Sequence, residues 1–286
     1  MIYDERCLEC LLSRVNLETD LIQCSQKRKN AIIAHADQMI RFLLKTPRTH
    51  PMVASELHRQ MYHLLKNPDP FYALKEVSQN VSLTVLKEIS GRLLTFQDCV
   101  LASVIGNMFD YGVKDHDIGD DFTSFFNEEF VSGLFVDNTN EILPLCHDMV
   151  YFTDNCGEIV FDAHLITWLK THGSRVTLVV RDKPVLNDAT LDEVYALNLD
   201  KKVDSLYTTG AGVELGIRFD LLPGEVMDAI DRCSLIISKG MANYESLREE
   251  EGLPPVAYLL AAKCDVIAEE LGVPKRSKIA LLRRSY

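Results

Sequence analysis

The chain has 286 residues, of which 47% are hydrophobic, and it carries 30 Lys and Arg against 42 Asp and Glu. This length and composition are typical of a globular protein of about two domains, with a core large enough to surround a buried site. The net charge of −12 argues against nucleic acid as a partner, because Lys and Arg on phosphates supply most of that affinity.

Up to about residue 145, apolar positions recur at helical spacing. Prolines interrupt the pattern at 47–51 and 67–70. Val81–Leu86 is also compatible with a strand, but its helical flanks favour a helix. We predict a helical domain over residues 1–145 that contributes to the pocket, with helices at Cys7–Leu17, Ala31–Leu44, Met52–Leu65, Val77–Leu94 and Phe96–Phe109.

After residue 145, short β-branched runs alternate with helical segments. The predicted strands are Asp148–Thr153, Arg175–Val180, Val203–Tyr207, Ser234–Ser238, Val256–Ala261 and, at the sheet edge, Lys278–Arg283, with helices at Gly157–Thr171 and Thr190–Ala196. This alternation predicts an α/β domain at residues 146–286, with a mostly parallel sheet and helices on both faces. We expect the two domains to pack together with the site between them.

Polar residues follow several of these strands, where open parallel sheets bind their ligands. The first strand ends at Asp154 and Asn155, the second runs into a loop that holds Asp188, and the fourth ends at Lys239 and Gly240. Carboxylate and amide oxygens are the ligands that Mg²⁺ and Mn²⁺ prefer. The same residues are also typical of helix N-caps, so their spacing leaves both interpretations open.

Lys239 follows an apolar strand, where a cationic side chain can reach a phosphate oxygen. A solvated loop lysine is the alternative. The nearby Asn243 and Glu245 fit either a binding site or an ordinary polar helix start.

Three other patterns point to different classes of protein. A strand ending in Asp154 resembles the aspartyl-phosphate phosphatases, but those need a second acid where this chain has Cys156. The loop Gly210–Gly216 resembles a nucleotide or methyl-donor loop, but it follows the third strand and lacks the GxGxxG spacing. The sequence contains no GxxxxGK[ST] phosphate loop, which excludes the common ATPases.

The cysteines indicate a reducing compartment, since all eight are scattered without the spacings of secreted proteins. Cys7 and Cys10 form a CxxC pair on a helix, with no second pair to complete a four-cysteine zinc site. Cys264 is a third thiol that can approach them, and two buried helix cysteines are the alternative. The N-terminus is acidic and no apolar stretch approaches the roughly 20 residues of a membrane span, so we expect a cytoplasmic protein without a membrane partner.

Taken in order along the chain, these motifs resemble the damage-control phosphatases, a family long labelled as a domain of unknown function and also named after a proposed acidic-residue methyltransferase. The resemblance covers most of the chain and is closest to the archaeal and bacterial branch with an N-terminal CxxC. Phe71 is a departure, because the family pattern has Tyr there. The matching motifs are Cys7-Leu-Glu-Cys10, Asp69-Pro70-Phe71 with Lys75, Gly106-Asn107 to Gly112, Asp154 to Glu158, Leu186-Asn187-Asp188, Ser238-Lys239-Gly240 with Asn243 and Glu245, and Lys263-Cys264.

The resemblance implies a helical domain beside a Rossmann-like α/β domain. It also implies a divalent metal (Mn²⁺, Ni²⁺, Co²⁺ or Mg²⁺) bound by Asp154, Asn155 and Asp188. The implied substrates are damaged or unwanted phosphometabolites, including sugar phosphates. The residues expected to bind the substrate are Lys239, which would hold the phosphate, together with Asn107, Asp110, Glu158, Gly240 and Asn243.

Our leading hypothesis is a metal-dependent phosphomonoesterase that acts on a small phosphorylated metabolite. The expected catalytic residues are Asp154, Glu158 and Lys239, with either Asp154 or Glu158 as the general base. One alternative is a carboxyl methyltransferase that uses S-adenosylmethionine, and another is a non-catalytic metabolite- or metal-binding protein. The phosphatase is favoured because metal ligands and a phosphate-binding cation occur together at strand ends. The physiological substrate, the metal and the oligomeric state have no signature in the sequence.

Overall fold

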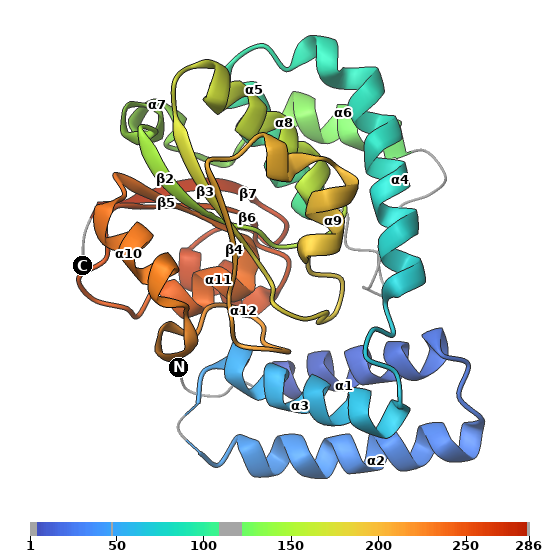
Figure 1. Ribbon diagram of the computed structural model, residues 1–286. Coiled ribbons are helices and arrows are strands. Elements are labelled where there is room, and N and C mark those ends of the chain that lie inside the picture. Colours follow the sequence, from blue (N-terminus) through green and yellow to red (C-terminus); the bar gives the residue numbers. More distant parts are fainter. Residues whose placement is uncertain (1–4, 47, 109–121, 285–286) are drawn as a thin grey trace.

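The computed structural model describes residues 5–46, 48–108 and 122–284 and places a seven-stranded sheet at the centre of the molecule (Figure 1). The strand order is β1-β7-β6-β5-β2-β3-β4, and β6 and β7 are the antiparallel pair. The strands are β1 (Val136–Asp137), β2 (Asp148–Phe152), β3 (Arg175–Val180), β4 (Ser205–Thr208), β5 (Leu235–Lys239), β6 (Val256–Ala261) and β7 (Lys278–Arg283). The predicted α/β class with a mostly parallel sheet is therefore confirmed.

The sheet is buried on both faces, which explains why its strands read as continuous apolar runs. Successive side chains of a strand point to opposite faces, so Met149 and Tyr151 of β2 join one core while Val150 and Phe152 join the other. The first core is completed by α4 (Tyr72–Ile89), α5 (Phe96–Met108), α6 (Phe122–Ser132), α8 (Glu158–Thr171) and α9 (Leu191–Ala196), and the second by α10 (Gly224–Arg232), α11 (Gly240–Leu247) and α12 (Asp265–Leu271).

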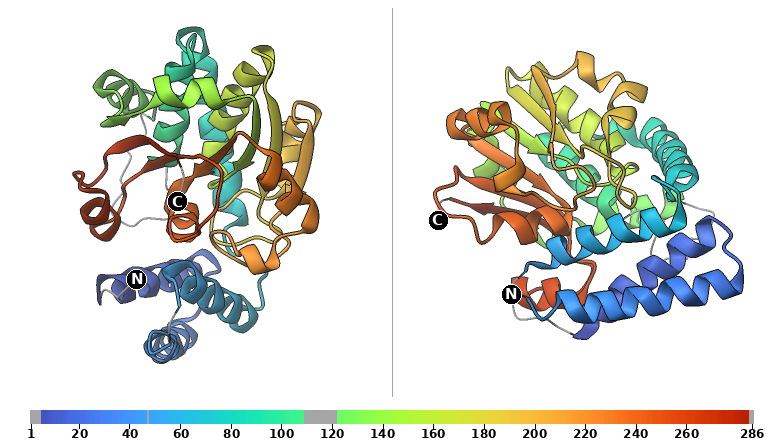
Figure 2. Two further views of the ribbon diagram at one scale, coloured as in Figure 1. Left: turned by 90° about the vertical axis from the view of Figure 1, so that its left-hand side faces the viewer. Right: turned by 60° about the horizontal axis from the view of Figure 1, so that its bottom comes forward.

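The first three helices form a layer of their own at one end of the sheet (Figures 1 and 2). They are α1 (Glu5–Leu21), α2 (Gln26–Leu43) and α3 (His50–Leu65), and they share a third core to which the α/β part contributes Val185 and Leu215. By contrast, α4 and α5 pack in the same core as the sheet. The domain boundary expected near residue 145 stays a prediction.

One detail of the predicted sheet is wrong. Lys278–Arg283 was expected at the edge, but β1 pairs outside it in parallel, with Val136 opposite Ile279. A two-residue strand is too short to show a periodic pattern, so the sequence carries no signal for it. The short helix α7 (Thr139–Ile142) follows β1 and contributes Ile142 to the first core.

Helix α4 packs closely against Gly157, the residue before α8. A Cβ atom at Gly157 would lie 2.3 Å from Ser78 Oγ and 3.0 Å from Ser82 Oγ, and both hydroxyls are buried without a hydrogen-bond partner among the described residues. We expect Gly157→Ala to lower the free energy of unfolding by about 1–3 kcal/mol because of this overpacking.

Adding Ser78→Ala to Gly157→Ala removes the nearest atom and leaves Ser78 Cβ at an ordinary 3.6 Å. We therefore expect the double variant to regain at least half of the lost stability, as measured by urea unfolding. Wild-type stability in Gly157→Ala alone would show that α4 does not pack as described.

Candidate active site

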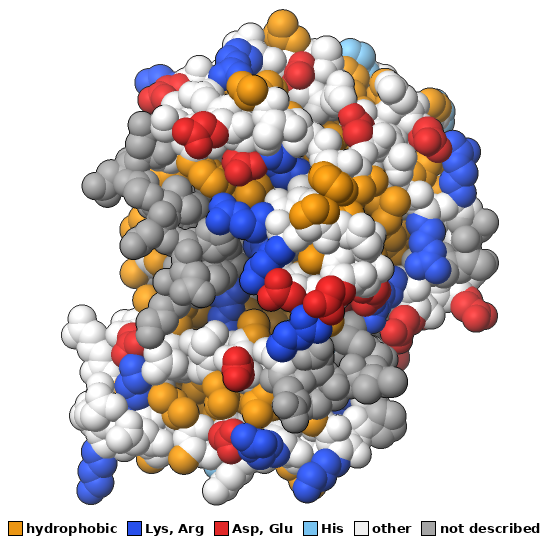
Figure 3. All heavy atoms as spheres, turned by 180° about the vertical axis from the view of Figure 1, so that it is seen from behind, with side chains coloured by type: hydrophobic (Ala, Val, Ile, Leu, Met, Phe, Trp, Pro, Cys, Tyr) orange, Lys and Arg blue, Asp and Glu red, His pale blue; other side chains and the backbone are white. Residues whose placement is uncertain are grey.

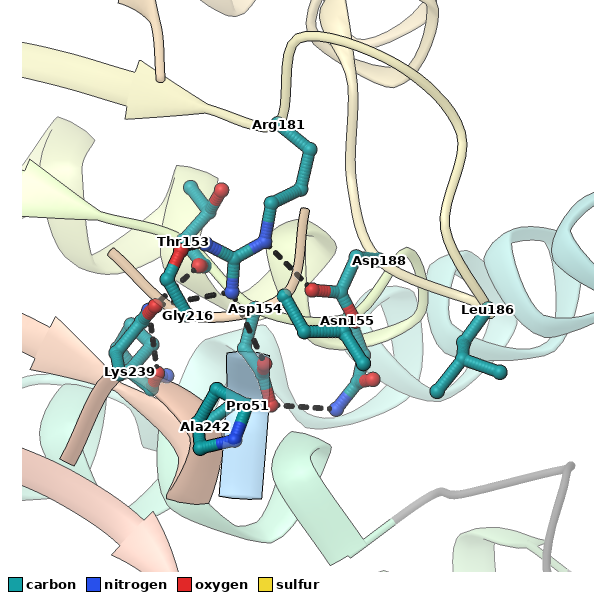
Figure 4. Close-up of polar contacts among 12 residues, drawn as sticks. Pro51, Thr153, Asp154, Asn155, Arg181, Leu186, Asp188, Gly216, Lys239 and Ala242 are labelled. Atoms are coloured by element: carbon teal, nitrogen blue, oxygen red, sulfur yellow. Dashed lines mark hydrogen bonds and ion pairs between the residues drawn. The ribbon is translucent and has the colours of Figure 1, made fainter. Parts of the chain in front are cut away.

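The structure brings the three predicted metal ligands together at the carboxyl ends of β2 and β3 (Figure 4). Asp154 and Asn155 follow β2, and Asp188 lies in the loop after β3. An antiparallel bridge joins Asn155 to Asp188, and the backbone N–H of Ala189 donates to the carbonyl of Asp154 over 2.7 Å. Backbone pairing between two loops therefore fixes the distance between the three side chains.

The side chain of Asn107, on α5, orients the Asp154 carboxylate through a hydrogen bond. Its Nδ2 donates to Asp154 Oδ2 over 2.9 Å and to Glu158 Oε2 over 2.7 Å, and its Oδ1 accepts from the backbone N–H of Ala261 over 3.1 Å. The side chain of Asn155 also donates to Asp154 Oδ2, over 2.9 Å. Asp154 is thus oriented by two amides, both of which donate to its Oδ2 atom.

A buried arginine, which the sequence reasoning missed, lies between the two acidic loops (Figure 4). Arg181 donates from Nε to Asp188 Oδ2 over 2.7 Å, and a terminal guanidinium nitrogen lies 3.9 Å from Asp154 Oδ1. The same guanidinium donates to the Asn243 side chain and the Gly216 carbonyl. The available signal was its position directly after the apolar strand β3.

Burial and mutual repulsion disfavour the charged forms of these acids. Burial raises the pKa of Asp154 well above its usual value, and the carboxylates of Asp188 and Glu158 raise it further. Burial also raises the pKa of Asp188, although the Arg181 guanidinium opposes the shift. Additional positive charge between Asp154 and Asp188 would stabilise both carboxylates.

The residue types at this position suit a hard divalent cation. Asp154, Asn155 and Asp188 all line one cavity of about 140 Å³. Such oxygen ligands suit Mg²⁺ or Mn²⁺, with water and substrate in the remaining positions. No group of three His, Cys, Asp or Glu side chains with metal-binding geometry occurs in the described part of the chain, so the candidate set combines the carboxylates of Asp154 and Asp188 with the amide of Asn155.

The cavity lies where the α1–α3 layer meets the strand ends. Figure 3 shows the surface hollowed along this junction, with Lys and Arg side chains gathered there. The helical layer lines the cavity with Cys10, Leu11, Arg14, His50, Pro51, Ala54 and His58, and the α/β part lines it with Asp154, Asn155, Leu186, Asn187, Asp188, Leu215, Met241, Ala242, Glu245 and Lys263.

One lysine, Lys263, is found among the described residues that line this cavity, and it lies just after β6. Its Nζ donates to the backbone carbonyl of Asn107 over 2.9 Å. Its charge also opposes the rise in the pKa values of Asp154 and Asp188. In the sequence Lys263 was a motif residue without an assigned role.

Lys239 has different contacts from those expected of a phosphate ligand. Its fully buried ammonium forms ion pairs with Glu158 and, at 2.7 Å, with Asp162, and it donates to Ser103 Oγ over 2.5 Å. Burial lowers the pKa of Lys239, but Asp162 and Glu158 outweigh it and hold the pKa above its usual value. Neither Lys239 nor Glu158 is among the described residues that line the cavity. Both are fully buried and support the Asp154 loop from the core side.

Gly240 and Asn243 also support the Asp154 loop instead of lining the cavity. Asn243 donates to the carbonyls of Thr153, over 3.0 Å, and Lys239, over 2.8 Å, and it accepts from Arg181. A Cβ atom at Gly240 would lie 2.0 Å from Asp154 Oδ2. The last predicted substrate residue, Asp110, lies outside the described residues.

We expect Gly240→Ala to reduce the activity of this site by at least about a hundredfold, because a displaced Asp154 carboxylate is misplaced for chemistry. Gly240 has φ +74°, so strain from a left-handed backbone would contribute to any loss of stability. Gly252→Ala is the matched control, since Gly252 has φ +75° but no neighbouring atom within 4 Å. Equal activity in the two variants would contradict the close approach at Asp154.

The glycines of the loop Gly210–Gly216 are partly explained by packing. A Cβ at Gly216 would lie 2.2 Å from Ser246 Oγ and 2.8 Å from the carbonyl of Ala242. The loop therefore gives the methyl-donor hypothesis no added support, and that hypothesis stays a prediction.

The CxxC pair lies at the margin of the cavity. Cys10 is exposed and lines the cavity, so the alternative of two buried helix cysteines is wrong. Burial raises the pKa of the Cys264 thiol, and the charges of Glu245 and Cys10 add to the rise. The approach of Cys264 to the CxxC pair stays a prediction.

The mostly parallel α/β fold places Asp154, Asn155 and Asp188 in a cavity at its strand ends, where enzymes of this fold class bind small molecules. Residues 3–279 match the damage-control phosphatase ARMT1-like domain. The chain is 36% identical to a damage-control phosphatase of Archaeoglobus fulgidus over 276 residues, which cover 93% of this chain and 94% of the relative. The chain therefore belongs to the damage-control phosphatase family, as the resemblance implied.

Two further comparisons, both with proteins of Pyrococcus horikoshii, agree with this family assignment. A damage-control phosphatase of that organism is 28% identical, with 96% of each chain covered. The crystal structure of a DUF89 family protein from the same organism matches the whole fold with a TM-score of 0.90, at 26% identity and 100% coverage of both chains. Within the described residues, no helix is long and apolar enough to cross a bilayer.

Proposed function

We propose that this phosphatase is a metal-dependent phosphomonoesterase that hydrolyses a small phosphorylated metabolite, such as a sugar phosphate or a damaged nucleotide. The observation that supports it most is that the side chains of Asp154, Asn155 and Asp188 line one cavity together with Lys263. The net charge of −12 and the cysteine usage support a cytoplasmic location and a small-molecule substrate over nucleic acid.

In this proposal Asp154, Asn155 and Asp188 would hold Mn²⁺, Ni²⁺, Co²⁺ or Mg²⁺. A divalent cation there supplies a Lewis acid for the phosphate ester and lowers the pKa of an attacking water. Arg181 keeps the Asp188 carboxylate oriented through its Nε contact.

The remaining roles follow from which side chains reach the cavity. Lys263 takes the phosphate-binding role first expected of Lys239, because its ammonium would stabilise charge on the transferring phosphoryl group. Asp154 is favoured as the residue that orients the attacking water, since Glu158 is held by Lys239 and Asn107 away from the cavity.

The proposal is tested by phosphate release from sugar phosphates and nucleotides, using chelator-stripped protein to which each metal is returned in turn. We expect release with at least one metal and none with chelator. Binding of labelled S-adenosylmethionine that survives chelator would favour the methyltransferase. Thermal stabilisation by the same esters without any release would favour a binding protein.

A further inference from the structure

A buried ionisable pair joins two helices of the N-terminal layer. Glu18 of α1 and His58 of α3 are both fully buried, and His58 Nδ1 lies 2.6 Å from Glu18 Oε1. Neither residue belongs to a motif identified in the sequence, and neither is used in the proposed hydrolysis.

Both outer atoms of the pair lack partners. His58 Nε2 and Glu18 Oε2 are buried and form no hydrogen bond with a described residue. Each such atom costs about 1–3 kcal/mol, and well-packed apolar side chains would often join two helices at least as well as a buried ion pair. The pair is therefore poorly explained by helix packing alone.

The location of His58 supplies a second observation. His58 lines the same cavity as Asp154, Asn155 and Asp188, but it comes from α3, in the helical layer. If the strand ends hold the metal and the phosphoryl group, the rest of the ester lies toward the helical layer, which His58 helps to form. A carboxylate at Nδ1 also fixes the imidazole orientation and tautomer, so Nε2 is the ring nitrogen left without a partner among the described residues.

We propose that His58 is a substrate-binding residue whose Nε2 forms a hydrogen bond with the leaving-group half of the phosphate ester, and that Glu18 positions the imidazole. The inference rests on the proposed function and adds to it a residue that recognises the alcohol portion of the substrate. A hydroxyl group suits this contact because it can donate to a neutral imidazole or accept from a charged one.

The kinetic test compares two kinds of ester in His58→Gln. Glycerol 1-phosphate and ribose 5-phosphate carry hydroxyl groups on the leaving group, whereas the leaving group of p-nitrophenyl phosphate has none. Loss of one hydrogen bond should raise KM for the first two about tenfold and leave p-nitrophenyl phosphate within about twofold. The matched control is His63→Gln, an exposed histidine on the same helix.

Glu18→Gln tests the positioning role, with Glu9→Gln, an exposed position on α1, as its control. We expect Glu18→Gln to raise KM selectively for the same two esters, by less than His58→Gln does. An equal loss on all three esters in both buried variants would assign the pair to structure alone and overturn the inference.

A second readout does not depend on turnover. The ring-nitrogen NMR signals of His58, assigned by their loss in His58→Gln, should shift when glycerol 1-phosphate is added with Mg²⁺. They should move little with inorganic phosphate and Mg²⁺. A His58 signal that no ester moves would refute the contact. If the protein releases no phosphate with any metal, the proposed function fails, and the ring signals still decide whether His58 binds the ester.

Discussion

Asp154→Asn is expected to reduce metal-dependent phosphate release by about 10³-fold or more and, at the same time, to stabilise the metal-free protein. The loss of activity follows from removing one of the two carboxylates that, with Asn155, make up the proposed metal-ligand set. The gain in stability follows because Asp154 is buried beside Asp188 and Glu158, whose negative charges oppose its own.

The measurement is thermal unfolding with chelator and with Mn²⁺, alongside phosphate release. In chelator at neutral pH, Asp154→Asn should melt at least about 2 °C above the wild type. The difference should narrow as the pH falls, because burial raises the pKa of Asp154 and protonation of the wild-type side chain removes the same charge. Mn²⁺ should stabilise the wild type and the exposed control Asp231→Asn, but not Asp154→Asn. Wild-type activity in Asp154→Asn would refute the assigned site.

Arg181→Gln is expected to produce the largest loss of stability, about 3–5 kcal/mol, because it leaves buried carboxylates without their cation. It also removes hydrogen bonds to Asp188, Asn243 and the Gly216 carbonyl. Added Mn²⁺ should recover part of the loss, since a cation at the strand ends would partly replace the missing charge.

Urea unfolding with and without Mn²⁺ measures this effect. The matched control is Arg175→Gln, whose side chain is 72% exposed and lies 3.7 Å from Asp148. An exposed pair of this kind contributes at most about 1 kcal/mol. If Arg181→Gln costs no more than the control, Arg181 does not hold the acidic loops together.

The fold could be predicted from the sequence because the central strands β2, β5 and β6 are buried apolar runs and helices such as α2 and α3 bury one apolar face. The metal-ligand set could be proposed because parallel strands end at one edge, which brings Asp154, Asn155 and Asp188 together. The same rule could not tell which lysine at a strand end lines the cavity and which is buried in the core. Lys239 points into a buried cluster with Asp162 and Ser103, which are 77 and 136 residues away in sequence, whereas Lys263 lines the cavity.

Other features of the site depend on contacts that no local pattern reports. In the sequence, Arg181 looks like any polar residue that follows a strand. Its role is visible only in the structure, where the loop that holds Asp188 folds back and accepts a hydrogen bond from it. The Glu18–His58 pair joins two helices over 40 residues of sequence, and neither position departs from ordinary helix composition. Side chains that act through long-range packing are therefore found in the structure and not in the motifs.

The central claim is that Asp154, Asn155 and Asp188 form one divalent metal site, and equilibrium binding of Mn²⁺ tests it most directly. Free Mn²⁺ is measured by electron paramagnetic resonance during titration of chelator-stripped wild type, Asp154→Asn, Asp188→Asn and the control Asp231→Asn. We predict one tight site per chain in the wild type and the control, and loss of that site in the other two variants. Equal Mn²⁺ binding by all four proteins would contradict the account.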